Sequence, residues 1–320
     1  MELATTQPSL STTQLRDLYQ RMLLTRLVDG YCWQLHQSGR IGFVASCRGH
    51  EAAQVGSAAC IRPSFDFTLP YYRDLGVVLT LGMTPYEIFR TYLQGWPGSL
   101  ANADQRLHRP IQHWGYHKHN MISGPVPVAT QILHAAGIAF ACKLRKSSAV
   151  AIAYCGDGAT AEPDFLEGLT FAAQQRLPVL FICEQDCSLD AQVFRLSPAR
   201  LPSGLTYRCV DGSDIREVYA FTSEALQLAR AGQGPILLEM LVTRGSPEQD
   251  EAECDPLSHC RRLLESRGAW DEAWYTQLAS RLRAEIEQAL EDALRDSHLS
   301  EPAEIQPANP APQHRAREGG

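Results

Sequence analysis

The sequence predicts an α/β protein in which helices flank a doubly wound, mostly parallel sheet. Two apolar runs of strand length, residues 149–155 and 179–183, enclose a segment whose apolar side chains recur near helical spacing. Two strands joined by one helix form a right-handed βαβ unit with a buried parallel pair. Helical and strand patterns continue to alternate as far as residues 235–241, which is typical of a doubly wound sheet.

Length and composition favour one large folded unit. The chain has 320 residues, 44% of them hydrophobic, which is enough for a sizeable core. No linker rich in Pro, Gly or Ser interrupts the middle of the chain, although its length suggests about two domains. We therefore expect a single domain over residues 11–296, with a disordered N-terminus at 1–10 and a disordered tail at 297–320.

Charge and cysteine content exclude several classes of protein. A formal net charge of -7 without a Lys/Arg cluster argues against nucleic-acid binding, and no apolar run reaches the roughly 18 residues of a membrane span.

The ten cysteines are scattered through expected strands and helices, with no signal peptide before them, so reduced thiols in a cytoplasm fit better than disulfides. Zinc is the alternative for Cys254, His259 and Cys260, but their spacing is not that of a zinc finger.

The first half of the chain begins with helices. Ser11 and Gln14 predict a capping box at the start of a long helix that ends at Gly39. One face of this helix carries an apolar stripe that docks it on the core or on another subunit: Leu15, Leu18, Met22, Leu27, Tyr31 and Leu35. The segment beginning Gly49-His50 opens another helix, to which we assign no chemistry. Further on, Arg73 is a permanently charged donor suited to holding a diphosphate in two hydrogen bonds, with the Tyr72 hydroxyl beside it. A surface ion pair between Arg73 and Asp74 is the alternative.

Residues 96–120 form a polar and aromatic stretch without clear periodicity, as functional loops often do. It holds four histidines: His108, His113, His117 and His119. A loop histidine is more often simply solvated than functional. Residues 127–131 then lead into a helix of small residues at 135–144.

The central βαβ unit carries an acidic site. Gly156-Asp157-Gly158 follows the first strand and Asp186 follows the second, so both carboxylates lie at the strand ends where ligands bind in open parallel sheets. Mg²⁺ prefers oxygen ligands and takes some of them from a bound phosphate, and the two glycines let the backbone approach that phosphate. The alternative is a tight turn with a helix cap.

The C-terminal third continues the alternation. A further strand, a helix at 214–231 and the strand at 235–241 complete the sheet. Residues 256–294 have a helical period, with Gly268 separating two pieces.

With these residues in view, the chain resembles a known family. Residues 149–186 look like the thiamine diphosphate motif, which begins Gly-Asp-Gly and closes with Asn-Asn. More narrowly, the chain resembles the alpha subunit of the 2-oxo acid dehydrogenase first component, above all the branched-chain 2-oxoisovalerate type, and is also similar to pyruvate dehydrogenase alpha. Segments 39–59, 69–89, 127–145, 209–219 and 255–274 follow in the family's order, so the resemblance covers residues 12 to 290.

The resemblance implies the thiamine diphosphate-binding fold and an acyl-transferring oxidoreductase. Such an enzyme decarboxylates a 2-oxo acid oxidatively and passes the acyl unit to a lipoyl domain of an acyltransferase. It implies an α2β2 heterotetramer with a beta subunit that supplies the activating glutamate, so this chain is inert alone. The implied cofactors are thiamine diphosphate and Mg²⁺, with K⁺ near Thr130 and Gln131.

The resemblance also implies residue roles. His113 is an active-site histidine, Val128 packs under the cofactor, and Ser188 offers a third, backbone ligand to the metal beside Asp157 and Asp186. The residues implied to bind the cofactor are Tyr72, Arg73, Val128, Gly156, Asp157, Gly158, Ala159 and Asp186.

Three departures from the family's pattern leave a second hypothesis open. Gln185-Asp186 replaces Asn-Asn and adds a negative charge beside the diphosphate. The segment after Asp186 is shorter than the family's loop and lacks its Gly-Tyr. After the strand at 235–241, Thr243-Arg244-Gly245 is followed by no Gly-His-Ser. The alternative is a degenerate, non-catalytic paralogue with a structural or regulatory role. A generic nucleotide-binding domain is not favoured, because the chain has neither a Gly-x-Gly-x-x-Gly motif nor a Walker lysine motif.

Overall fold

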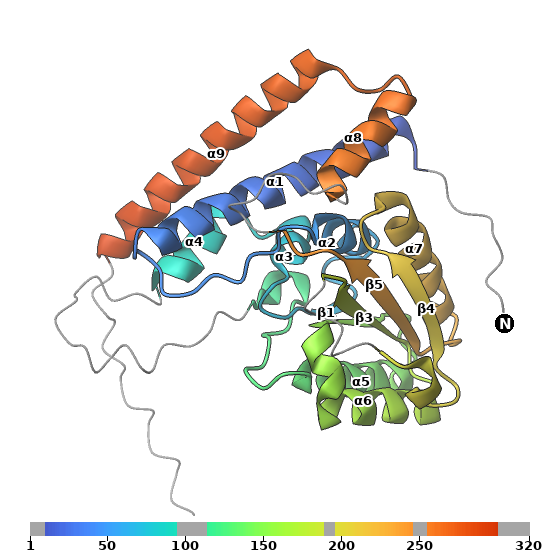
Figure 1. The fold of residues 1–320 in the computed structure, drawn as a ribbon. Helices are drawn as coiled ribbons and strands as arrows, with labels where there is room; N and C mark the ends of the chain where they lie inside the picture. Colours follow the sequence, from blue (N-terminus) through green and yellow to red (C-terminus); the bar gives the residue numbers. More distant parts are fainter. Residues whose placement is uncertain (1–9, 95–113, 189–195, 246–254, 300–320) are drawn as a thin grey trace, which may run out of the picture.

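The computed structural model describes residues 10–94, 114–188, 196–245 and 255–299, and a five-stranded sheet lies at its centre (Figure 1). The sheet order is β1-β2-β3-β5-β4, and every neighbouring pair is parallel. This confirms the predicted fold class of a parallel sheet flanked by helices. The strands are β1 (Phe67–Leu69), β2 (Ala151–Gly156), β3 (Val179–Asp186), β4 (Thr206–Asp211) and β5 (Ile236–Val242).

Both faces of the sheet are covered, because successive strand residues serve opposite cores. Ile152, Tyr154 and Ile182 pack with α2 (Glu51–Ala58), α3 (Leu75–Thr80) and α7 (Ile215–Arg230). Ala153 and Phe181 point the other way and pack with α5 (Thr130–Leu144) and α6 (Pro163–Gln175). Figure 1 shows α5 and α6 on one side of the sheet and α7 on the other. Burial on two faces explains why these strands read as continuous apolar runs.

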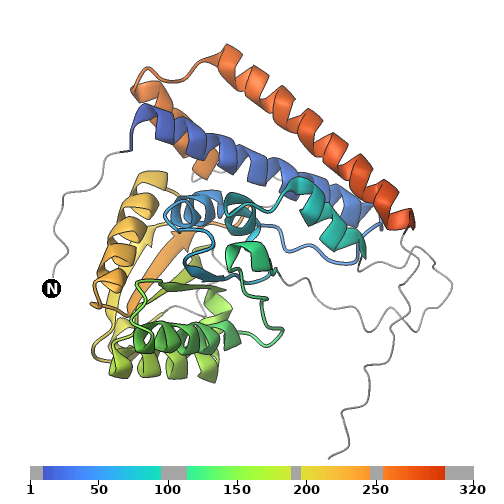
Figure 2. The same cartoon turned by 180° about the vertical axis from the view of Figure 1, so that it is seen from behind.

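An outer layer of helices lies over α2 and α3 (Figure 1, and Figure 2 from behind). It consists of α1 (Thr12–Gln37), α4 (Pro85–Gln94), α8 (Pro256–Ser266) and α9 (Glu272–Leu299). Ser11 and Gln14 form the predicted capping box at the start of α1. Leu15, Leu18 and Met22 of its stripe are buried, whereas Leu27 and Tyr31 are only partly buried. None of the helices in the described ranges is long and apolar enough to cross a membrane.

Several element boundaries differ from the expected ones. β3 continues to Asp186, which we had placed just past its end, because β5 pairs with β3 as far as Asp186 and Val242. α5 begins at Thr130 rather than at residue 135. α9 continues to Leu299, past residue 297 where we expected the tail to begin. Leu10, which we expected in the disordered N-terminus, is buried, and its carbonyl accepts from Arg267. Residues 1–9 and 300–320 lie outside the described ranges, so disorder there stays a prediction.

Candidate active site

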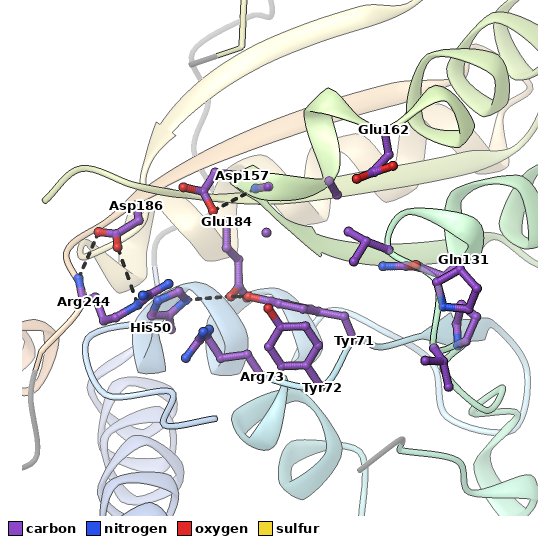
Figure 3. Close-up of a pocket in the computed structure, with 17 residues that line it drawn as sticks. His50, Tyr71, Tyr72, Arg73, Gln131, Asp157, Glu162, Glu184, Asp186 and Arg244 are labelled. Carbon is purple, nitrogen blue, oxygen red and sulfur yellow. Dashed lines mark hydrogen bonds and ion pairs between the residues drawn. The ribbon is translucent and has the colours of Figure 1, made fainter. Parts of the chain in front are cut away.

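A cavity of about 210 Å³ opens at the carboxyl ends of β2 and β3 (Figure 3). Ligand crevices of open α/β sheets lie at this edge. The cavity brings together residues from the α2–α3 region, the start of α5, the ends of β2 and β3, and the segment after β5. Every residue that the sequence assigns to the cofactor lines it: Tyr72, Arg73, Val128, Gly156, Asp157, Gly158, Ala159 and Asp186.

The register of β2 against β3 determines how close the two predicted metal ligands lie. Gly156 pairs with Glu184 across the two strands, so Asp157 follows at about the level of Gln185 and Asp186 comes one residue later. Parallel neighbours are about 4.8 Å apart, which places the two aspartates at one corner of the sheet edge. Figure 3 shows both carboxylates at the same end of the cavity. The Gly158 N–H donates to Asp157 Oδ1 at 3.0 Å.

The Asp186 carboxylate is contacted by residues that follow β3 and by residues that follow β5. Backbone N–H groups of Ser188 and Arg244 donate to its Oδ1 at 3.0 and 3.4 Å, and Arg244 Nε lies 3.5 Å from its Oδ2. Burial alone raises the pKa of Asp186, but these hydrogen bonds and the Arg244 charge outweigh it and hold the pKa below its usual range. Ser188 is therefore adjacent to the predicted metal site, and the metal role of its carbonyl stays a prediction.

Arg73 and Tyr72 form the wall facing the aspartates. The Arg73 guanidinium donates to the Ser46 carbonyl at 2.5 Å and lies 5.6 Å from the centroid of the Tyr72 ring. Asp74 is buried and accepts from the Tyr71 N–H at 2.7 Å instead of pairing with Arg73. The ion-pair alternative for Arg73 was thus wrong, because the turn points Asp74 inward.

A buried polar cluster forms the floor of the cavity. Glu184 Oε2 accepts from Tyr71 at 2.8 Å and Gln54 at 3.2 Å, and lies 2.7 Å from His50 Nδ1. Burial, together with the charge of Glu184, raises the pKa of Tyr71 and of Asp74 well above their usual ranges. Burial in this cluster therefore favours the uncharged form of both groups.

The opposite wall is apolar and open. Val126 is 63% exposed and Val128 is 50% exposed. Next to them, Thr130 donates to Asp164 at 2.7 Å and Gln131 donates to the Tyr154 carbonyl at 2.9 Å. The exposed valines leave an apolar surface available to a bound ring.

The donor set suits a magnesium-bound diphosphate. Mg²⁺ needs few protein carboxylates when a phosphate supplies other ligands. The described ranges contain no group of three or more His, Cys, Asp or Glu residues arranged to hold a metal ion. A Cβ built on Gly158 would meet nothing within 4 Å, so the space beside this backbone is open to a ligand. Two residues that line the cavity have buried polar atoms without a hydrogen-bond partner, His50 at Nε2 and Glu184 at Oε1.

Sequence reasoning missed His50, Tyr71 and Glu184, and named Arg244 only as part of the segment that lacks the family's Gly-His-Ser. Glu184 did carry a signal, because a charged residue directly after a buried apolar strand needs a partner. His113 lies outside the described residues, so its active-site role stays a prediction. Cys254 of the zinc alternative lies outside them as well, and every cysteine within them is a free thiol.

Comparison with known proteins gives a consistent result. The family model described as "Dehydrogenase E1 component" matches residues 19–301. The chain is 35% identical over 299 residues to the 2-oxoisovalerate dehydrogenase subunit alpha of Bacillus subtilis, covering 87% of this chain and 89% of that protein. It is 33% identical over 304 residues to the 3-methyl-2-oxobutanoate dehydrogenase subunit alpha of Mycobacterium tuberculosis, covering 87% and 79%. It is 31% identical over 309 residues to the pyruvate dehydrogenase E1 component subunit alpha of Staphylococcus aureus, covering 89% and 80%.

Proposed function

The chain belongs to the dehydrogenase E1 component family, and we propose that it is the alpha subunit of a branched-chain 2-oxo acid dehydrogenase. The reaction is the oxidative decarboxylation of a 2-oxo acid, with transfer of the acyl unit to a lipoyl domain. The observation that carries the proposal is the convergence of all eight predicted cofactor residues on one cavity.

Each group around the cavity has a role toward thiamine diphosphate. Asp157 and Asp186 hold Mg²⁺, with the Ser188 carbonyl as a third protein ligand. Arg73 and Tyr72 bind the diphosphate, and the backbone at Gly156, Gly158 and Ala159 approaches it closely because the glycines carry no side chain. When bound, thiamine diphosphate supplies the nucleophilic carbon and the electron sink that decarboxylation of a 2-oxo acid requires.

The apolar wall positions the rings of the cofactor. Val128 is half exposed at the start of α5 and offers a wedge under a bent cofactor. The proposal includes a K⁺ site at Thr130 and Gln131 and an active-site role for His113.

Assembly completes the site. We propose an α2β2 heterotetramer in which a beta subunit contributes the glutamate that activates the aminopyrimidine, and an acyltransferase component that presents the lipoyl group. Free thiols throughout the described residues support a cytoplasmic location.

Calorimetry on the chain assembled with its beta subunit tests this proposal. Thiamine diphosphate with Mg²⁺ should bind saturably, and Asp157→Ala should abolish binding because it removes a metal ligand. Asp17→Ala on the exposed face of α1 is the matched control and should bind like the wild type. A correctly assembled tetramer that binds no cofactor would instead support a non-catalytic paralogue.

A further inference from the structure

His50 is buried at the edge of the cavity with one ring nitrogen engaged and the other unused. It is 2% exposed, lines the cavity, and sits at the end that also holds Asp186, Arg244 and Arg73 (Figure 3). Its Nδ1 lies 2.7 Å from Glu184 Oε2, whereas its Nε2 is buried and has no hydrogen-bond partner. Buried polar atoms rarely remain unpaired in proteins, so the vacant Nε2 requires an explanation.

The hydrogen bonds at Glu184 determine which way the imidazole faces. Gln54 Nε2 can only donate and the Tyr71 hydroxyl donates, so Glu184 Oε2 acts as an acceptor for both, and for the Nδ1–H of His50 as well. The proton on Nδ1 leaves Nε2 on the far edge of the ring from Glu184. Such a carboxylate–imidazole pair orients a histidine for a ligand on its other nitrogen.

The backbone that carries His50 is held on three sides. Asp29 accepts from the Ser46 hydroxyl at 2.6 Å and from the Cys47 N–H at 2.9 Å, and Arg73 holds the Ser46 carbonyl. The Gly245 N–H donates to the Arg48 carbonyl at 3.0 Å, which ties this loop to the segment carrying Arg244. These contacts place His50 with little freedom to turn away.

We infer that His50 is a binding residue for the diphosphate end of the cofactor: as the imidazolium, protonated on both ring nitrogens, it donates from Nδ1 to Glu184 and from Nε2 to a phosphate oxygen. The inference rests on the proposed function and deepens it. It also assigns an anion-binding histidine to a chain whose segment after β5 lacks the family's histidine. The neighbouring Arg73 and Arg244 make this end of the cavity the place where an anion is attracted.

Two substitutions distinguish the contribution of Nδ1 from that of Nε2. The amide nitrogen of Asn occupies the place of Nδ1, so His50→Asn keeps the contact to Glu184 and loses the contact from Nε2. The amide nitrogen of Gln reaches the place of Nε2, so His50→Gln keeps a donor toward the phosphate. A hydrogen bond to a charged group is worth about 1.5–3 kcal/mol, which corresponds to about 10- to 100-fold in affinity.

The experiment titrates thiamine diphosphate with Mg²⁺ into the assembled protein by calorimetry, and inorganic pyrophosphate with Mg²⁺ as a second probe. We expect His50→Asn to weaken both by about tenfold or more, and His50→Gln to stay within about threefold of the wild type. Unphosphorylated thiamine should bind the three proteins alike. Melting temperatures without ligand verify folding, and His50→Met replaces His50→Asn as the variant without a donor if the latter fails to fold.

The outcomes distinguish this inference from the proposed function. Wild-type affinity in His50→Asn, or equal losses in His50→Asn and His50→Gln, overturns the inference and leaves a purely structural histidine or one whose Nε2 binds a buried water. Failure of the wild-type assembly to bind thiamine diphosphate overturns the proposed function, and the inference with it.

Discussion

Arg244 and Asp186 come from segments 58 residues apart in the chain and meet at one end of the cavity, with Nε of the arginine 3.5 Å from Oδ2 of the aspartate. Asp186 stands where the family has an asparagine, so it adds a negative charge where the diphosphate is expected. Arg244 offsets that charge. The departure from the family's pattern at Asp186 is therefore compensated electrostatically at the same end of the cavity.

A double-mutant cycle tests this compensation. Arg244→Gln should weaken binding of thiamine diphosphate with Mg²⁺ by about tenfold, because it leaves the Asp186 charge unbalanced beside the diphosphate. The same change combined with Asp186→Asn should cost clearly less. Arg145→Gln on the exposed end of α5 is the control for the loss of one positive charge. Strictly additive effects on the measured affinities would contradict the coupling.

Gly158 should be dispensable for folding and essential for binding. A Cβ at this position meets no atom within 4 Å, so Gly158→Val should leave the melting temperature nearly unchanged. The valine side chain would occupy the space in which the protein backbone contacts the phosphate. We therefore expect the affinity for thiamine diphosphate to fall at least tenfold. Calorimetry and thermal unfolding on the same preparation measure both effects. A large loss of stability would show that Gly158 is a structural glycine.

Gly49 should show the reverse behaviour. Its φ is +91°, and a Cβ there would lie 2.0 Å from the Thr243 carbonyl oxygen, so Gly49→Ala forces the two loops that carry His50 and Arg244 apart. We expect the free energy of unfolding to drop by about 3 kcal/mol in a urea titration. Gly137→Ala is the matched control, because this exposed glycine of α5 has nothing within 4 Å and alanine should stabilise the helix by about 0.5–1 kcal/mol.

Asp214 should make the stability of the protein depend on acid pH. It caps α7 by accepting from the Arg216 N–H at 2.8 Å, and Arg216 Nε also donates to it at 3.0 Å. Burial raises its pKa, but the hydrogen bonds and charge of Arg216 outweigh this and lower the pKa of Asp214 below its usual value. A carboxyl with a depressed folded-state pKa stabilises the protein above its unfolded pKa, and this stabilisation disappears as the pH falls through the folded pKa.

The comparison of wild type with Asp214→Asn isolates that contribution. The difference in free energy of unfolding should be constant from about pH 7 to about pH 5 and shrink below about pH 4. Urea unfolding at each pH gives the difference directly. A difference that does not change with pH would mean that the cap acts through hydrogen bonding alone.

Much of the fold and part of the site were predictable from local patterns. The apolar periods of residues 149–186 gave β2, α6 and β3, and Asp214 and Ser11 marked the helix starts where the structure has them. Gly156, Asp157 and Asp186 follow from the same patterns, because strand ends are visible in a sequence. The inward orientation of the Asp74 side chain was not predictable. Asp74 accepts a hydrogen bond from the Tyr71 N–H, and this pair becomes buried only when the sheet is covered.

The sequence by itself determined the fold class, the family and the acidic corner of the cavity, because each depends on short-range periodicity or on a contiguous motif. Only the tertiary structure decided that His50 meets Glu184 across 134 residues and that Arg244 meets Asp186. The physical reason is that such pairs depend on strand order and register. Neighbours in a parallel sheet are joined by long crossovers, so side chains far apart in the chain come within hydrogen-bond distance only after the sheet is assembled.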